Sequence, residues 1–245
     1  MKKPFIFFAI VTLGLLSYAL YMALVVAPTE ATMGDVQRIF YYHVPNAWCA
    51  FLCFAINAVA SIWYLVKRGL KSDALALASA EVGVVFCTVV LVTGPIWARP
   101  VWGIWWTWDA RLTTTLILWL IYVSYLMLRR FSTGGQTPVL AAALAVFGFL
   151  DVPIVYMSIR LFRTQHPQPV IGGGEGSGID PAMLKALMAN WVAWMALAAG
   201  LIATRYVLER RRQHIEEAHA LRDEAVATDD NSRTLSNVSR EGRAV

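Results

Sequence analysis

Long apolar runs alternate with short polar segments along most of this chain. Six of the runs are about 20 residues long and contain few charged side chains. A helix of about 20 apolar residues crosses the ~30 Å hydrocarbon layer of a membrane. The pattern therefore predicts an all-α integral membrane protein in residues 1–208, followed by a polar tail, partly disordered, in residues 209–245. The six predicted spans cover residues 4–26, 45–66, 73–93, 112–128, 138–157 and 184–207.

The composition supports a membrane protein over a soluble one. Hydrophobic residues make up 58% of the chain and charged residues 15%, whereas soluble domains are about 25% charged. The net charge is +5, but the basic residues cluster at the ends of the apolar runs, which indicates membrane sidedness rather than nucleic-acid binding. One side of the predicted membrane collects most of the basic residues that flank the spans. They include Lys2, Lys3, Lys67, Arg68, Lys71, Arg129 and Arg130. We therefore expect both termini in the cytoplasm and no nucleic-acid partner.

The predicted outer segments are longer than the inner connections and contain the unusual side chains. They cover residues 27–44, 94–111 and 158–183, and five of the ten tryptophans fall within residues 97–108. Tryptophan gathers at membrane interfaces, so this density is typical either of an aromatic belt or of a platform for a large planar ligand. Because function concentrates in such segments, we expect the site on the outer face.

The tryptophan-rich segment, residues 97–112, has a helical repeat after Pro100. Four of its side chains are spaced i, i+3, i+4 and i+7, which predicts a short interfacial helix with one flat aromatic face. These residues are Trp102, Trp105, Trp106 and Asp109. Arginines at both ends of the segment are suited either to ligand carboxylates or to lipid headgroups. They are Arg99 and Arg111.

Two of the four histidines lie in predicted outer segments. His43 immediately precedes the second span, so its ring is expected at the outer boundary, and His166 lies in the last outer segment. A single interfacial histidine is usually structural, but two on one face beside an aromatic segment favour haem held by one imidazole on each side. Copper or zinc is disfavoured because no third ligand accompanies them. The glycine-rich residues 172–178 are interpreted as a tolerated insertion rather than a lid.

Several polar or reactive residues lie inside the predicted spans. A charge there is costly and therefore needs a partner. Asp151 is expected to form an ion pair with Arg99, Arg111 or Arg160, whereas Glu81 receives no assigned role. The cysteines in the apolar runs are expected to be small core residues. They are Cys49, Cys53 and Cys87.

The stretch from Trp102 to Thr113, WGIWWTWDARLT, is similar to the tryptophan-rich WWD signature of haem-handling proteins. The chain length, the six spans, the sequence Tyr42-His43-Val44-Pro45 and His166 make the chain most similar to the cytochrome c maturation protein C family, over about residues 35–207. The resemblance implies a bacterial inner-membrane protein rather than an enzyme. Such a protein binds haem b at the outer face and delivers it to a membrane-tethered haem chaperone.

The resemblance also implies ligands and partners. His43 and His166 match the two axial ligands of the haem iron, while Arg99 and Arg111 are candidates for the haem propionates. The residues that match the haem platform are Trp102, Trp105, Trp106, Trp108 and Asp109. The implied partners are the haem chaperone cytochrome c maturation protein E, the ABC transporter subunits A and B, the small protein D, and membrane lipid.

Three other functions are compatible with parts of the pattern. A membrane subunit that transports haem or another solute ranks second, although we find no internal repeat or polar midplane in support. A redox protein of the cytochrome b type is disfavoured because no histidine lies in the interior of a span. A structural scaffold remains the third alternative, and haem content distinguishes it from a haem-handling protein.

Overall fold

The computed structural model describes residues 3–132, 134–162, 164–167 and 178–241, with side chains described as far as residue 228. Within these ranges no strand occurs, and six helical segments are long and apolar enough to cross a membrane. The helices are α1 (Lys3–Tyr21), η1 (Met22–Val26), η2 (Asp35–Ile39), α2 (Phe40–Lys67), α3 (Leu70–Trp102), α4 (Ala110–Phe131), α5 (Thr137–Phe149), α6 (Asp151–Leu161) and α7 (Pro181–Glu241). The predicted all-α membrane fold with six spans is therefore confirmed.

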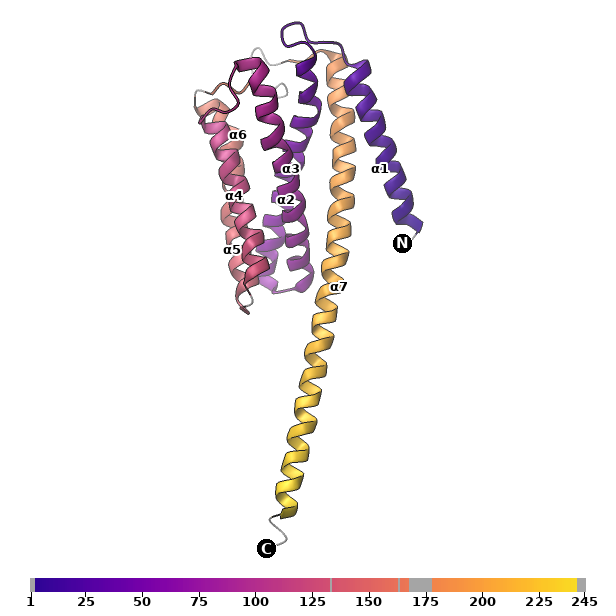
Figure 1. Ribbon diagram of the computed structural model, residues 1–245, viewed down its shortest axis with the longest axis vertical. Helices are drawn as coiled ribbons and strands as arrows, with labels where there is room; N and C mark the ends of the chain where they lie inside the picture. The colour runs from indigo at the N-terminus through magenta and orange to yellow at the C-terminus, as the bar shows by residue number, and fades with distance from the viewer. Residues whose placement is uncertain (1–2, 133, 163, 168–177, 242–245) are drawn as a thin grey trace. The chain divides into compact units, whose positions relative to one another are not determined.

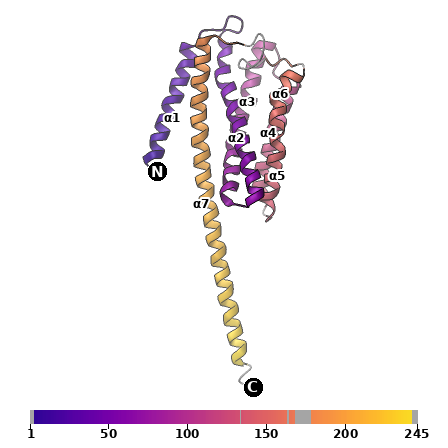
Figure 2. The same cartoon turned by 180° about the vertical axis from the view of Figure 1, so that it is seen from behind.

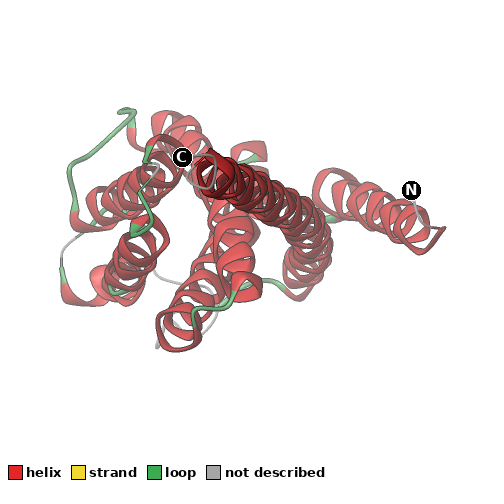
Figure 3. Ribbon diagram, turned by 90° about the horizontal axis from the view of Figure 1, so that it is seen from below, coloured by secondary structure: helices red, strands yellow, loops and turns green. Residues whose placement is uncertain are grey.

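The chain divides into two compact units, Met1–Tyr206 and Val207–Val245. In the first unit, α2 and α3 lie side by side, with α4, α5 and α6 on one flank and the first part of α7 on the other (Figure 1, Figure 2). A view from below places α1 at the edge of this unit, beyond α7 (Figure 3). The side chain of Asn190 in α7 attaches α1, because its Nδ2 donates to the carbonyl of Ala19 at 3.0 Å.

Phe54 of α2 packs closely against both α3 and α4. The ring of Phe54 in α2 stacks on the ring of Tyr122 in α4, with centroids 3.8 Å apart and planes 13° apart. Gly83 in α3 leaves room for Phe54, because a Cβ at this position would lie 2.6 Å from the ring. The three cysteines are buried free thiols, as expected for small core residues.

Two ion pairs join helices within the first unit. Glu81 of α3 binds Arg205 of α7, with Oε1 and Nη2 2.7 Å apart. Asp73 at the start of α3 binds Arg129 near the end of α4, with Oδ2 and Nη2 2.9 Å apart. Each arginine makes two hydrogen bonds to its carboxylate, which neutralises the charges of both pairs. The carboxylate that received no role from the sequence, Glu81, therefore fastens α3 to α7.

The prediction of an ion pair for Asp151 is wrong. Asp151 has no ion-pair partner among the described residues, and its Oδ2 is buried without a hydrogen bond. Two of the three candidate arginines contact other groups. Arg111 donates to the carbonyl of Val155 at 2.6 Å, and the guanidinium of Arg160 lies 5.7 Å from the ring centre of Tyr156.

The helix ends around the tryptophan-rich segment also differ from the prediction. Helix α3 continues past Pro95 and Pro100 and ends at Trp102, because Gly103 takes a left-handed conformation with φ +79°. Residues 104–109 are not helical, so the predicted interfacial helix over residues 102–109 is wrong. The spacing of Trp102, Trp105, Trp106 and Asp109 matches a helical period. The left-handed Gly103 nevertheless ends the helix directly after Trp102.

The fifth span consists of two helices. Helix α5 ends at Phe149 and α6 begins at Asp151, although the prediction gives one continuous span over residues 138–157. Pro153 accounts for the break, because it has no N–H to donate to the carbonyl of Phe149 four residues earlier. In the first turn of α6 the same N–H is not required, so proline is tolerated there.

Candidate functional site

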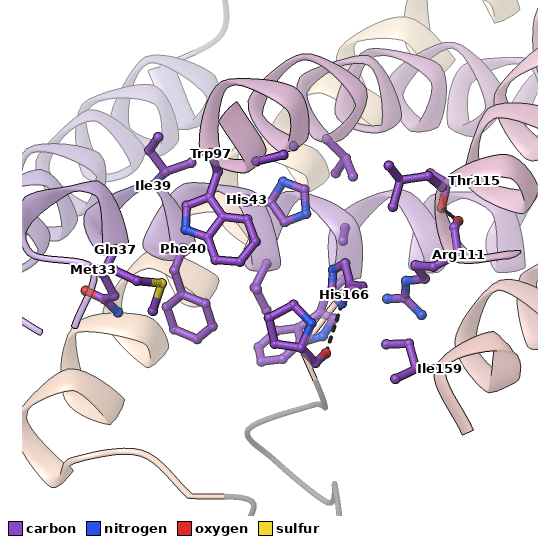
Figure 4. Close-up of a pocket in the computed structure, with 18 of the residues that line it drawn as sticks. Met33, Gln37, Ile39, Phe40, His43, Trp97, Arg111, Thr115, Ile159 and His166 are labelled. Carbon is purple, nitrogen blue, oxygen red and sulfur yellow. Dashed lines mark hydrogen bonds between the residues drawn. The ribbon is translucent and has the colours of Figure 1, made fainter. Parts of the chain in front are cut away.

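A cavity of about 850 Å³ opens at one end of the first unit. We call this end the site end, and it contains the start of α2, the end of α3, and the starts of α4 and α7. Cavities that hold ligands measure about 300–1,000 Å³ and combine apolar walls with a few convergent polar groups. This cavity has that character. His43, Arg111 and His166 line it (Figure 4), and so do the carboxylate residues Glu30 and Asp180.

Helix α2 positions His43. The residue lies in the first turn of the helix, which begins at Phe40, earlier than the predicted start at residue 45. Its imidazole faces the cavity beside the indole of Trp97 (Figure 4). The ring Nδ1 lies 2.8 Å from Oγ1 of Thr93 in α3, so a side chain of the neighbouring helix holds the ring.

The loop between α6 and α7 positions His166. Its Nδ1 lies 2.9 Å from the carbonyl oxygen of Pro167, and because a carbonyl only accepts, Nδ1 carries the proton. Burial, together with the positive charge of Arg111, lowers the pKa of His166 to about 4. The imidazole is therefore neutral near pH 7, with the lone pair on Nε2. Neutral imidazole is the form that binds metal ions.

Asp109 connects the tryptophan-rich segment to the His166 loop. Its Oδ1 accepts a hydrogen bond from the backbone N–H of Leu112 at 3.0 Å, which caps α4. Its Oδ2 accepts from the hydroxyls of Thr107 at 3.1 Å and Thr164 at 2.9 Å. Burial raises the pKa of Asp109, but these hydrogen bonds outweigh it and leave the pKa below its ordinary value. Thr164 in turn accepts from the backbone N–H of His166 at 3.1 Å.

Only two of the four tryptophans predicted to form a platform line the cavity. Trp102 and Trp106 line the cavity, whereas the side chains of Trp105 and Trp108 are 58% and 77% exposed and lie outside its lining. Trp97 also lines the cavity, and its ring meets Trp102 edge to face with centroids 5.1 Å apart. Trp97 was not among the predicted binding residues, although extending the helical repeat of the third span past residue 93 would have placed it on the cavity side.

The two candidate arginines have different positions. Arg111, the second residue of α4, lines the cavity and points toward the neighbourhood of His166 (Figure 4). One of its five donors binds the carbonyl of Val155, which leaves other donors for a ligand. Arg99 is exposed on the last turns of α3 and does not line the cavity. Asp109 is likewise absent from the lining and acts on the site through its hydrogen bonds.

The donors in the cavity suit an iron that needs only two protein ligands. In the described part of the chain, no group of three or more histidine, cysteine, aspartate or glutamate side chains is arranged to hold a metal ion. A porphyrin supplies four nitrogens itself, so two imidazoles would complete the six-fold coordination of its iron. The Nε1–H of Trp106 is buried without a hydrogen-bond partner among these residues, which leaves a donor in the wall for a polar group of a ligand. The glycine-rich residues 172–177 lie outside the described residues.

The fold and site together define a six-span membrane protein with a tryptophan-lined cavity that two histidines face. Residues 1–222 match the family model described as Heme exporter protein C. Heme exporter protein C of Bradyrhizobium diazoefficiens is 34% identical over 207 residues, which cover 83% of this chain and 78% of the relative. Heme exporter protein C of Escherichia coli (strain K12) is 33% identical over 202 residues, covering 78% and 79%. The chain therefore belongs to the Heme exporter protein C family.

The likeness extends to plant mitochondria. A putative cytochrome c biosynthesis ccmC-like mitochondrial protein of Marchantia polymorpha is 32% identical over 198 residues, covering 81% of this chain and 82% of the relative. The predicted family is thus confirmed. Membership indicates a multi-pass membrane protein with a role in haem handling for cytochrome c maturation.

Proposed function

We propose that this protein binds haem b in the cavity at the site end and delivers it to a membrane-tethered haem chaperone. One observation carries the proposal: the imidazoles of His43 and His166 face the same tryptophan-lined cavity from different elements (Figure 4). The Nε2 atoms of these two rings are the proposed axial ligands of the iron. Bis-histidine ligation occupies both axial positions and so limits oxygen chemistry while haem is in transit.

Three indoles and one guanidinium of the lining suit the rest of a haem molecule. The indoles of Trp97, Trp102 and Trp106 offer apolar surface to the porphyrin, and the free donors of Arg111 suit a propionate. Asp109 supports His166 through Thr164 instead of touching haem. The exposed candidates Arg99, Trp105 and Trp108 receive no contact with haem in this proposal.

The protein transfers its cargo without catalysing a covalent step. Two imidazoles and apolar contacts hold haem by bonds that an incoming ligand can replace, and His166 lies on the loop between α6 and α7. We propose a bacterial inner membrane, with the site end outside and both termini in the cytoplasm, since the basic residues favour this orientation. The proposed partners are the chaperone cytochrome c maturation protein E, the ABC transporter subunits A and B, and the small protein D. The relatives' name, heme exporter, is consistent with such a system.

The test compares visible absorption spectra and haem content of the detergent-purified protein with those of His43→Ala and His166→Ala. Wild type is expected to show six-coordinate low-spin haem, because both axial positions are filled. Each variant is expected to become high-spin or to lose haem, and to load the chaperone poorly. The matched control is His219→Ala, which removes an exposed histidine far along the chain from the cavity residues. A wild type that contains no haem and takes up none would favour the transporter subunit or the scaffold.

A further inference from the structure

The hydroxyl of Thr93 makes two short contacts, and the proposed function uses neither. Its Oγ1 lies 2.8 Å from Nδ1 of His43 and 2.7 Å from the carbonyl oxygen of Val89 in the preceding turn of α3. Both distances fall within the range of good hydrogen bonds. Thr93 thus joins α3 to the one cavity histidine that is carried by a helix.

The positions of the hydrogen atoms follow from these contacts. A carbonyl oxygen has no hydrogen to give, so both contacts are hydrogen bonds at once only when the hydroxyl of Thr93 donates to the carbonyl of Val89. The hydroxyl therefore faces His43 with a lone pair, and the hydrogen between them belongs to Nδ1. Because a neutral imidazole carries one N–H, the lone pair of His43 is on Nε2.

We propose that Thr93 is a positioning residue that holds His43 as the Nδ1–H tautomer and presents Nε2 to the cavity. This inference rests on the proposed function, in which Nε2 of His43 binds the haem iron. Histidines that bind metals usually donate their second N–H to an acceptor, which fixes the ring and raises its basicity as a ligand. Thr93 supplies that acceptor across the α2–α3 interface. The imidazole of His43 also packs next to Gly94 of α3. A Cβ added at Gly94 would lie 3.5 Å from Cε1 of His43, which is an ordinary van der Waals distance.

The test replaces the hydroxyl and keeps the shape of the side chain. Thr93→Val removes the acceptor, whereas Thr93→Ser retains it. The control is Thr88→Val in the same helix, because Thr88 also donates to a carbonyl four residues earlier, that of Val84 at 2.7 Å, and accepts from an aromatic N–H, that of Trp119 at 2.8 Å. Thr88 does not line the cavity. Haem titration, the absorption spectrum and the midpoint potential of bound haem are measured for all four proteins.

We expect Thr93→Val to bind haem about 10–100-fold more weakly, the usual effect of removing such a partner, with more high-spin iron and a shifted potential. Thr93→Ser and Thr88→Val are expected to match wild type. Wild-type affinity, spectrum and potential in Thr93→Val would overturn the proposal, and so would an equal loss in Thr88→Val. These results differ from failure of the proposed function, in which wild type itself takes up no haem.

A second measurement needs neither haem nor a variant of Thr93. In haem-free protein with ¹⁵N-labelled histidine, the nitrogen chemical shifts report which ring nitrogen of His43 carries the proton, and His43→Ala identifies the signal. A protonated Nδ1 with a bare Nε2 supports the role of Thr93. The reverse tautomer overturns it, even if Thr93→Val fails to fold.

Discussion

Asp109 divides its two carboxylate oxygens between two structural functions. One oxygen caps α4 through the N–H of Leu112, and the other accepts from Thr164, which also binds the backbone of His166. A carboxylate is suited to both, because it accepts several hydrogen bonds at once. The position of the His166 loop therefore depends on a residue that does not line the cavity.

An Asp109→Asn substitution separates the two functions. The amide oxygen can still cap α4, but the amide NH₂ cannot accept from the hydroxyl of Thr164, so the hydrogen bond from Thr164 to a charged acceptor is lost while the helix start is kept. Hydrogen bonds to charged groups contribute about 1.5–3 kcal/mol. We therefore expect roughly tenfold weaker haem binding and more high-spin iron, measured by haem titration.

A double-mutant cycle provides the control for this substitution. Thr164→Val removes the other side of the same hydrogen bond, so the effects of Asp109→Asn and Thr164→Val on haem affinity should be non-additive. Additive effects, or wild-type affinity in Asp109→Asn, would show that this hydrogen bond does not support the site.

The residues of the site differ in how far the sequence could predict them. His43 and His166 stand out because the other histidines lie in a charged tail. The pairing of His43 with Thr93 joins residues 50 positions apart, and no local pattern indicates it. The role of Asp109 was equally hidden, because aspartate before a helix is a common cap and its second contact depends on a loop 55 residues away.

At the scale of elements, the packing of α2 against α3 depends on a missing side chain. At Gly83 a Cβ would lie 2.6 Å from Cε1 of Phe54 and 3.1 Å from Cβ of Cys53. The ring of Phe54 is fully buried and stacked on Tyr122, so it has little room to move away. The two helices therefore approach closely only because residue 83 is glycine.

We expect Gly83→Ala to destabilise the protein by about 1–3 kcal/mol, the usual cost of overpacking a core. The thermal unfolding midpoint in detergent should fall accordingly. Gly14→Ala is the matched control, because an added Cβ in α1 meets nothing within 4 Å. Its midpoint should be unchanged or slightly higher, since alanine favours helix over glycine. Equal midpoints for the two variants would contradict the packing argument.

Prolines explain where the predicted elements and the observed ones diverge. Pro95 and Pro100 do not end α3, although a proline inside a helix usually breaks it. Membrane-spanning helices tolerate proline because neighbouring groups satisfy the freed carbonyls. The prediction ended the third span at residue 93 and so left Trp97 off the helix. Pro153 had the opposite outcome, because α5 ends four residues before it.

For the whole molecule, apolar run length and composition were enough to predict the class of fold. Burial in lipid requires long helices, and only helices or closed barrels satisfy their backbone groups there. The number of long apolar runs in the sequence also predicted the number of spans. The cavity did not follow, because it is formed by residues from six helices and three loops whose packing no run length describes.

All residues that line the cavity belong to the unit Met1–Tyr206. Deleting residues 229–245 should therefore leave the haem content and the low-spin spectrum unchanged. The free energy of unfolding should stay within about 0.5 kcal/mol of wild type, as for changes away from structural features. Haem quantification of the shortened protein checks this expectation. Loss of haem with an intact fold would place part of the binding determinant in the deleted segment.

The ion pair between Glu81 and Arg205 has a consequence for the synthesis of the protein. The two residues are 124 positions apart, so at about 5–20 residues per second the ribosome reaches Arg205 roughly 6–25 s after Glu81. During that interval the third span holds a carboxylate without this partner, and an uncompensated charge in a membrane is unfavourable. Insertion of the last span supplies the guanidinium. The order of the chain thus makes α7 the segment that completes assembly, and a nascent chain stopped before it contains Glu81 without its arginine partner.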